Sequence, residues 1–219
     1  LNKKVANYEG IVRKGPILNP EEDVYPLEEG GYWIKSGITV FTSLYLQGLF
    51  LSCQKKGVKF EKKEIKKEEG LDCFDAVVLA LGWGIREFIS PEELGINFVR
   101  GQALVCKTNV PLKNSISSKV YTALTEENSV VHVGATYERD EIHEEKNREK
   151  AQRLLSCPYD EVIGVKAGVR VTNRRHYFPI VERINPKTWV VTALGSRGFL
   201  YHGYLAQHIL KKEVKECLK

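Results

Sequence analysis

The 219 residues are 42% hydrophobic and 28% charged, a balance typical of a soluble globular protein. No apolar run approaches the roughly 18 residues needed to span a membrane, and no signal peptide is visible after Leu1. The net charge of +5 would help an anionic partner such as RNA to approach, but it identifies none.

The sulfur-containing and imidazole residues exclude several kinds of site. The five cysteines include no CxxC pair, which argues against a zinc site or a disulfide framework and favours a reducing cytoplasm. The five histidines show neither HxH nor HExxH spacing, so no metal site is expected. No methionine occurs, so we expect the sequence either to be a fragment or to lack methionines that the protein has.

The first elements in chain order are an extended segment and a helix. Residues 32–40 are predicted to be extended, with a turn at Ser36-Gly37. Residues 42–56 have helical spacing, with Thr42 or Ser43 as N-cap and Gly57 as the residue that ends the helix. The expected buried face is Leu46, Leu49, Phe50 and Cys53. A strand exposed on one side is predicted for residues 58–65.

Residues 76–81 are continuously apolar, as in a parallel strand buried on both faces. This segment runs into Gly82-Trp83-Gly84, but Glu87 stands where a dinucleotide-binding GxGxxG fingerprint needs its third glycine. The glycine pair is therefore rejected as a primary cofactor fingerprint.

The middle of the chain is dominated by strands with alternating patterns. Strands are predicted for residues 96–108, 162–172 and 177–184, and a β-hairpin for residues 119–124 and 129–137. Residues 141–155 are predicted to form a charged surface helix.

The end of the chain reads as a buried strand, a glycine turn and a helix. The apolar run 189–194 predicts the strand, and Gly195-Ser196-Arg197-Gly198 follows it. The helix after the turn is expected to bury Leu200, Tyr204, Leu205, Ile209 and Leu210. From these residues alone, the turn is either an ordinary strand–helix connection or a site for an anionic or electron-rich ligand.

Arg170 interrupts an otherwise apolar strand, directly after Gly168-Val169. It must either face solvent or bind an anion, because an unpaired buried charge is costly. A guanidinium on a rigid strand is a good bidentate receiver for a carboxylate. Both readings stay open at this stage.

Six motifs in order resemble the D-amino-acid-oxidase-like, glycine-oxidase-type family of FAD-dependent oxidoreductases. They are Gly30-Gly31-Tyr32 with the helix and Gly57-Val58, the strand Asp75 to Gly82, Val99-Arg100-Gly101-Gln102, Gly134-Ala135-Thr136-Tyr137, Gly168-Val169-Arg170 with Phe178-Pro179-Ile180-Val181, and Leu194 to Phe199. The Gly-Ser-Arg-Gly and Arg-Gly-Gln forms are most similar to the subgroup that makes up the oxidase domain of bifunctional tRNA 5-methylaminomethyl-2-thiouridine biosynthesis proteins.

The resemblance implies a mixed fold, α/β plus α+β. Residues 38–95 and 186–219 would form an incomplete FAD-binding layer of the glutathione-reductase type. Residues 1–37 and 96–185 would form an antiparallel substrate-binding sheet interleaved with that layer. The N-terminal GxGxxG unit, which holds the ADP moiety of FAD in this family, is absent from the sequence.

The resemblance also implies site residues. Arg170 would hold a substrate carboxylate, and Tyr137 would wall the substrate pocket. The implied FAD contacts are Gly82, Gly101, Gln102, Gly195, Ser196, Arg197, Gly198 and Phe199. No metal is expected.

In this family FAD accepts a hydride from the carbon next to an amine, and the resulting imine hydrolyses. The preferred substrate by resemblance is a carboxymethylaminomethyl uridine in tRNA, with Arg174, Arg175 and His176 as RNA contacts. A free glycine or D-amino-acid oxidase is one alternative. A truncated or degenerate binding module without activity is another, because GxGxxG is missing and Val171 and Glu182 replace the family's proline and glycine.

Overall fold

The computed structural model describes residues 23–28, 31–66, 71–109, 112–117, 120–138, 160–210 and 214–215. The chain divides into two compact units, Leu1–Val40 and Phe41–Lys219. In the first unit β1 (Val24–Pro26) and β2 (Tyr32–Ile34) pair as antiparallel strands. The predicted turn at Ser36-Gly37 is confirmed, since the Gly37 N–H donates to the Ile34 carbonyl at 3.1 Å.

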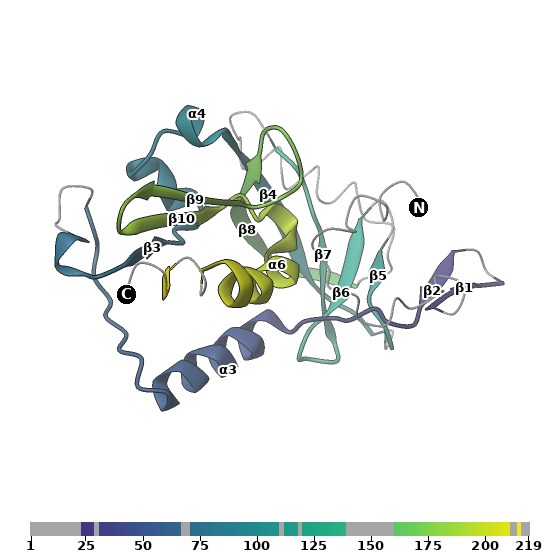
Figure 1. Ribbon diagram of the computed structural model, residues 1–219. Coiled ribbons are helices and arrows are strands. Elements are labelled where there is room, and N and C mark those ends of the chain that lie inside the picture. The colour runs from purple at the N-terminus through teal and green to yellow at the C-terminus, as the bar shows by residue number, and fades with distance from the viewer. Residues whose placement is uncertain are drawn as a thin grey trace. The chain divides into compact units, whose positions relative to one another are not determined.

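Within its described residues, the second unit contains two sheets (Figure 1). The smaller sheet has the order β3-β10-β9, with β3 parallel and β9 antiparallel to β10. Its strands are β3 (Val77–Leu79), β9 (Ile180–Asn185) and β10 (Thr188–Thr192). The larger, antiparallel sheet has the order β5-β6-β7-β4-β8. Its strands are β4 (Ile96–Lys107), β5 (Ile116–Ser117), β6 (Tyr121–Leu124), β7 (Val130–Gly134) and β8 (Glu161–Asn173).

Helical segments connect these strands. They are α3 (Thr42–Lys55), the 3₁₀ segments η2 (Leu71–Cys73), η3 (Gly82–Glu87) and η4 (Gly195–Arg197), the short helices α4 (Pro91–Leu94) and α6 (Gly198–Tyr204), and the π-helical segment η5 (Leu205–Leu210). The sequence of α4 explains its sharp ends. The Ser90 hydroxyl accepts from the Glu93 N–H at 3.2 Å, and Gly95 ends the helix at φ 62°.

Strand β4 joins the two sheets through its hydrophobic contacts. Its first residue, Ile96, is fully buried in a core with Leu79 and Val190 of the smaller sheet. Further along β4, Leu104 and Cys106 lie in a second core within the larger sheet. A 12-residue strand therefore carries side chains of both cores, and it holds the end of β8 close to β10.

Most strand predictions are confirmed, including the parallel strand β3, the long strands β4 and β8, and the β6–β7 hairpin. The strand predicted for residues 177–184 exists as β9, but it pairs with β10 and not with the antiparallel sheet with which the sequence pattern grouped it. The physical reason is the tight connection through Pro186 and Lys187, which makes β9 and β10 a hairpin. The helix predicted for residues 141–155 lies outside the described residues, and the domain boundaries stay a prediction.

Three predictions near α3 are wrong. Residues 58–65, predicted to form a strand exposed on one side, form no strand in the structure. The helix itself is confirmed, and Gly57 ends it at φ 81°, but its N-cap is Phe41 without a side-chain hydrogen bond. The predicted apolar face is not buried: Leu46, Leu49 and Phe50 are exposed, and Cys53 is half-buried.

The predicted buried face of the last helix is also partly wrong. Leu200 is 62% exposed, whereas Tyr201, one position along, is 3% exposed. Leu205 is buried as predicted. The α-helix begins only at Gly198, after a 3₁₀ turn. The buried side of the helix is therefore rotated, so that Tyr201 and not Leu200 is buried.

Candidate functional site

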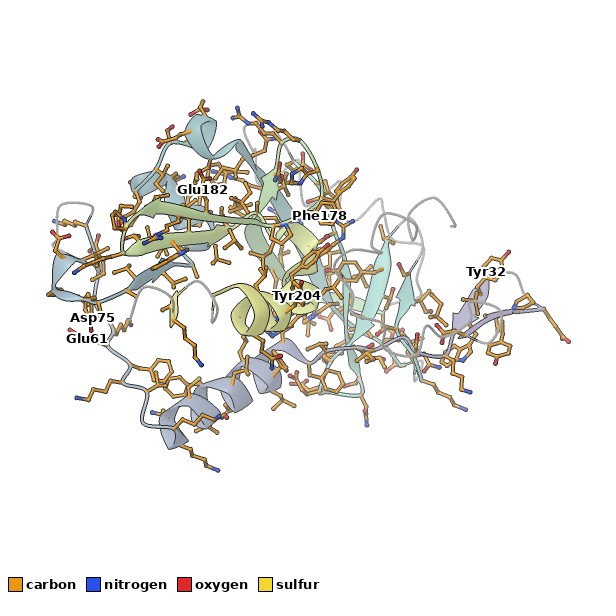
Figure 2. All side chains as sticks on the ribbon, in the orientation of Figure 1. Tyr32, Glu61, Asp75, Phe178, Glu182 and Tyr204 are labelled. Atoms are coloured by element: carbon orange, nitrogen blue, oxygen red, sulfur yellow. The ribbon has the colours of Figure 1, made fainter. Side chains whose placement is uncertain are left out.

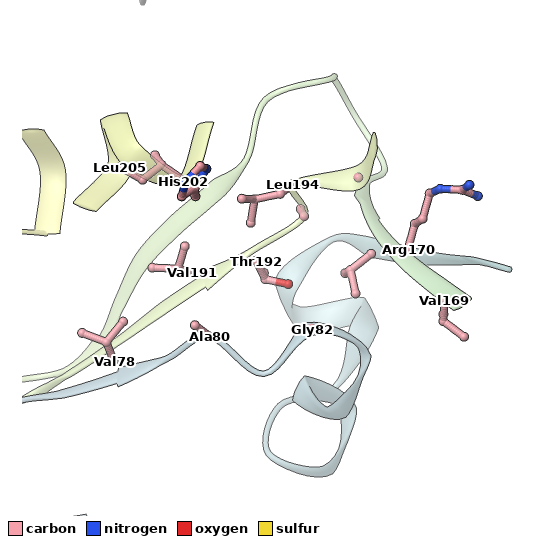
Figure 3. A pocket seen from close by; sticks show the side chains of 13 residues that line it. Val78, Ala80, Gly82, Val169, Arg170, Val191, Thr192, Leu194, His202 and Leu205 are labelled. Atoms are coloured by element: carbon pink, nitrogen blue, oxygen red, sulfur yellow. The ribbon is translucent and has the colours of Figure 1, made fainter. Parts of the chain in front are cut away.

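A pocket of about 470 Å³ lies where β3 and β10 end (Figure 3). Its lining residues come from these two parallel strands, from β8, from the turn after β10 and from the last helix. They are Val78, Ala80, Gly82, Val169, Arg170, Val171, Val191, Thr192, Ala193, Leu194, Gly195, His202 and Leu205. The carboxyl ends of parallel strands are where open α/β sheets bind ligands, and the volume suits a small molecule or part of a cofactor.

The backbone bends sharply on leaving both parallel strands. Gly82 after β3 and Gly195 after β10 have φ of 55° and 57°, a region that glycine enters without steric cost. Ala193 also has a positive φ, 61°, although it carries a β-carbon. These bends place main chain against the pocket at Gly82 and Gly195, so a flat ligand can approach there without meeting a side chain.

Thr192 places a hydroxyl in this mainly apolar pocket. The residue is 3% exposed, and its Oγ1 has no hydrogen-bond partner among the described residues. Figure 3 shows the hydroxyl directed toward the space beside Gly82. An unpaired buried hydroxyl is destabilising, so it marks a place where a ligand would supply a partner.

Arg170 forms one end of the pocket, and its guanidinium reaches past the pocket to Gly101 on the neighbouring strand. A β-carbon at Gly101 would collide with Arg170 Nη1 and would lie 2.6 Å from the Thr136 carbonyl oxygen. The absence of a side chain at Gly101 is therefore what gives the guanidinium its position. Nη1 is buried and has no hydrogen-bond partner in the described part of the chain.

Two tyrosines interact with this guanidinium, Tyr137 by a ring contact and Tyr121 through the charge. Its Cζ lies 4.7 Å from the centre of the Tyr137 ring, a cation–π contact. Burial raises the pKa of Tyr121, the positive charge of Arg170 opposes that rise, and Tyr137 adds to it. The Tyr121 hydroxyl is therefore protonated at neutral pH and available as a donor close to a fixed positive charge.

The neighbouring Gln102 and Thr136 fix the backbone behind this cluster. The Gln102 N–H donates to Thr136 Oγ1 at 3.0 Å, and the Thr136 N–H donates to the Gln102 carbonyl at 3.0 Å. Gln102 Oε1 is buried without a hydrogen-bond partner among the described residues. Arg170 Nη1 and Gln102 Oε1 are thus buried polar atoms without a hydrogen-bond partner among the described residues, and their side chains project from opposite faces of the large sheet.

His202 lines the pocket from α6, and both of its ring nitrogens form hydrogen bonds. Nδ1 lies 3.0 Å from the Gly198 carbonyl oxygen, so Nδ1 carries the proton of the neutral ring. Nε2, 2.6 Å from the Tyr45 hydroxyl, then accepts. The Tyr45 ring also packs edge-on against Phe199, 5.5 Å between centroids, so α3 and α6 are tied together beside the pocket.

The turn after β10 is tied to the segment before β9 that contains the basic turn Asn173-Arg174-Arg175-His176. Arg197 Nη1 donates to the Tyr177 carbonyl at 3.3 Å, and its guanidinium lies 4.9 Å from the Tyr177 ring centre. In the basic turn Arg174 forms an ion pair with Glu92 at 3.2 Å and donates from Nε to Asn97 Oδ1 at 2.9 Å. Arg175 and His176 are exposed.

The structure brings the predicted site residues together only in part. Gly82, Arg170 and Gly195 line the pocket. Gly101 and Tyr137 contact the guanidinium, whereas the side chain of Gln102, next to Gly101 on the same strand, projects from the opposite face of the sheet. Ser196, Arg197, Gly198 and Phe199 follow in the turn and first helical turn but do not line the pocket. Glu182 is exposed on β9 (Figure 2).

Sequence reasoning missed Thr192, His202 and Tyr121. Thr192 could have been noticed in the sequence, because it is the one hydroxyl residue in the otherwise apolar run 189–194. His202 follows Gly198 by one helical turn, but that spacing matches no ligand-binding motif. Tyr121 reaches Arg170 only through the pairing of β6 with β7, which no local pattern reveals.

A family model for FAD-dependent oxidoreductases, named DAO, matches residues 3–211. The chain belongs to this family. FAD is the cofactor of the family.

Two solved glycine oxidases resemble the chain. The enzyme from Geobacillus kaustophilus is 16% identical with a TM-score of 0.49, and the match covers 64% of this chain and 41% of that one. The enzyme from Bacillus cereus is 17% identical with a TM-score of 0.47, and the match covers 64% of this chain and 42% of that one. The chain therefore spans about two fifths of the length of these enzymes.

The pocket fits the ring system of FAD. Its walls are mainly apolar, main chain without side chains faces it at Gly82 and Gly195, and an unpartnered hydroxyl points into it from Thr192. A flat ring with one polar edge is the kind of group that such a pocket accepts. In the described residues, no group of three or more potential metal ligands occurs. A search of the same residues finds no helix that could span a membrane.

Proposed function

We propose that this chain belongs to an FAD-dependent oxidoreductase that oxidises the C–N bond of a glycine-like amine. The observation that carries the proposal is the position of Arg170, at one end of a pocket that fits the flavin ring and beside Tyr121 and Tyr137. A fixed guanidinium with an unpartnered Nη1 suits the carboxylate of such a substrate.

The chain's own residues would bind and orient the substrate. Arg170 would donate two hydrogen bonds to the substrate carboxylate, which would fix the position in the pocket of the carbon that loses hydride. Tyr121 would donate a hydrogen bond to the same carboxylate, because its raised pKa keeps the hydroxyl protonated. The apolar walls from Val171, which is buried, and Leu194, which is half-buried, would limit the access of water.

Bound FAD would supply the acceptor for the hydride. A reaction of this kind needs orientation and electrostatics from the protein more than an acid–base pair. The described site is consistent with that requirement, since Arg170 and Tyr121 offer a fixed charge and a hydrogen-bond donor.

One observation favours a substrate attached to tRNA over a free amine. The basic turn lies beside the glycine turn after β10, because Arg197 bonds to the carbonyl of Tyr177. Arg175 and His176 are exposed there and could meet an RNA phosphate. Arg174, the third residue proposed for RNA contact, is already paired with Glu92, so we assign the contact mainly to Arg175.

The test uses the full-length protein that carries this chain. Oxygen uptake or reduction of an artificial electron acceptor is measured with glycine, with sarcosine, and with tRNA that carries carboxymethylaminomethyl uridine. Turnover of either class supports amine oxidation, and the preferred class identifies the substrate. A colourless protein that takes up no FAD would contradict the proposal and leave a binding module of the same fold.

A further inference from the structure

We propose that the Thr192 hydroxyl forms a hydrogen bond with the polar edge of the flavin ring and so positions the ring in the pocket. The inference rests on the proposed function, because it requires that FAD occupies the pocket. It concerns a side chain that lies outside the six family motifs and that the sequence pattern presents as part of a buried strand.

Thr192 has no other use for its hydroxyl within the described structure. The residue is only 3% exposed, and its buried Oγ1 lacks a hydrogen-bond partner among the described residues. If this side chain served only to pack the strand, valine would fill the same space without an unpaired hydroxyl that lowers stability. The hydroxyl is therefore expected to find its partner in the pocket.

Few other side chains that line the pocket could form a hydrogen bond with a ligand. Of the 13 lining residues, only Arg170, Thr192 and His202 have polar side chains. His202 is occupied by the Tyr45 hydroxyl and the Gly198 carbonyl. The Arg170 guanidinium is directed beyond the pocket toward Gly101. Thr192 is thus the side chain placed to meet a polar atom of a ligand inside the pocket.

The distribution of polarity along the pocket suggests which edge of the ring it meets. Figure 3 shows Val78 and Leu205 at the end away from Arg170, with Thr192 between that apolar end and the arginine. The flavin ring has an apolar dimethylbenzene half, while its hydrogen-bonding atoms lie at the centre and on the pyrimidine half. An apolar half beside Val78 and Leu205 would leave the polar edge near Thr192.

The experiment compares Thr192→Val and Thr192→Ser in the full-length protein. Apoprotein is titrated with FAD by flavin fluorescence, and the visible absorption spectrum of the bound flavin is recorded. Thr192→Val is expected to bind FAD about tenfold more weakly, as for the loss of a typical hydrogen bond, and to shift the visible bands, because ring hydrogen bonds tune flavin electronics. Thr192→Ser is expected to retain both properties.

Thr188→Val on the same strand is the matched control. Thr188 is 7% exposed and does not line the pocket, so its replacement is expected to leave flavin affinity and spectrum unchanged. The melting temperature of each apoprotein shows whether folding is affected. Thr192→Val is expected to melt no lower than wild type, because the change removes an unpaired buried hydroxyl.

The possible outcomes separate this inference from the proposed function. A wild-type protein that binds no FAD overturns both. Wild-type binding with unchanged affinity and spectrum in Thr192→Val overturns the Thr192 contact alone. Weaker binding with an unchanged spectrum also overturns it, because the hydroxyl would then contact the ribityl chain or act through packing.

Discussion

The guanidinium of Arg170 lies directly against the α-carbon of Gly101, on the neighbouring strand of the large sheet. A β-carbon at Gly101 would overlap Nη1 and would lie 3.1 Å from Cζ of the same guanidinium. The direction of the arginine is thus fixed by a missing side chain on the partner strand. If Arg170 binds the substrate carboxylate, Gly101 acts on substrate binding through Arg170.

Replacing Gly101 by alanine is expected to displace Arg170. The new methyl group cannot be accommodated by the arginine alone, since the Thr136 carbonyl oxygen would lie 2.6 Å away. We expect a loss of about 1–3 kcal/mol in the free energy of unfolding, typical of overpacking, and at least a tenfold higher KM for a carboxylate substrate. Urea unfolding and steady-state kinetics measure the two effects.

Gly168→Ala provides the matched control for this prediction. Gly168 is the register partner of Gly101 on β8, and none of the described residues has an atom within 4 Å of a β-carbon built there. Gly168→Ala should therefore change both quantities little. Equal effects of the two substitutions would contradict the prediction. They would show that any added side chain on these paired strands lowers stability and raises KM, whatever the position of Arg170.

Arg170 itself should affect substrate binding far more than folding. Its buried Nη1 has no hydrogen-bond partner among the described residues, so Arg170→Ala removes little from the folded protein beyond the contact with Tyr137. Loss of a charge-assisted bidentate contact predicts a rise in KM of about 10- to 100-fold. Arg170→Lys should restore charge but not the two-pronged contact, and so should recover activity only partly. Unchanged kinetics in Arg170→Ala would remove the residue from the site.

His132 is expected to make stability depend on pH below neutrality. Burial lowers the pKa of His132 below 6.5, and Lys166 lowers it further, while Glu126 opposes the shift. The unfolded chain therefore binds a proton at a higher pH than the folded protein does. The stability associated with neutral His132 is present above about pH 6.5 and is lost as the pH falls through the folded-state pKa.

Urea midpoints at pH 7.5 and pH 5.0 test this expectation. His132→Gln should reduce the difference between the two midpoints, because the titrating group is gone. Lys166→Gln should reduce it to a smaller extent, since it removes the second cause of the lowered pKa. A difference that is the same in His132→Gln as in wild type would contradict the assignment.

Replacing Ala193 by glycine is expected to increase the stability of the fold. Its φ of 61° places an L-residue in the left-handed region, which costs roughly 1–2 kcal/mol, while glycine loses about 0.5–1 kcal/mol in chain entropy. Ala193→Gly should therefore stabilise the protein by up to about 1.5 kcal/mol. Ala193→Val should destabilise it, because a β-branched residue fits this φ poorly and the site is buried. Thermal unfolding measures both, and a less stable Ala193→Gly protein would contradict this reading.

The sequence predicted those parts of the fold that depend on local pattern. The apolar run before Gly82 and the run before Gly195 became the parallel pair β3 and β10. The alternation around Gly101 became the long strand β4. In each case the pattern of the segment itself decides between strand and helix, so no knowledge of distant residues was needed.

The parts that could not be predicted depend on pairing between distant segments. Tyr121 lies near Arg170 only because β6 pairs with β7, and β9 joined the smaller sheet through its hairpin with β10. The unpaired state of the Thr192 hydroxyl can be seen only when its neighbours are known. The rotated face at Leu200 follows from a 3₁₀ turn, which apolar spacing does not reveal.

Titration of the full-length apoprotein with FAD tests the central claim most directly, when wild type is compared with a variant whose pocket is blocked. Ala80→Trp places an indole at a lining position, whereas Ala206→Trp adds the same group at an exposed position that does not line the pocket. We predict that wild type and Ala206→Trp bind FAD with flavin absorption bands, and that Ala80→Trp does not while remaining folded. Equal binding by Ala80→Trp and wild type would contradict the assignment of this pocket to the flavin.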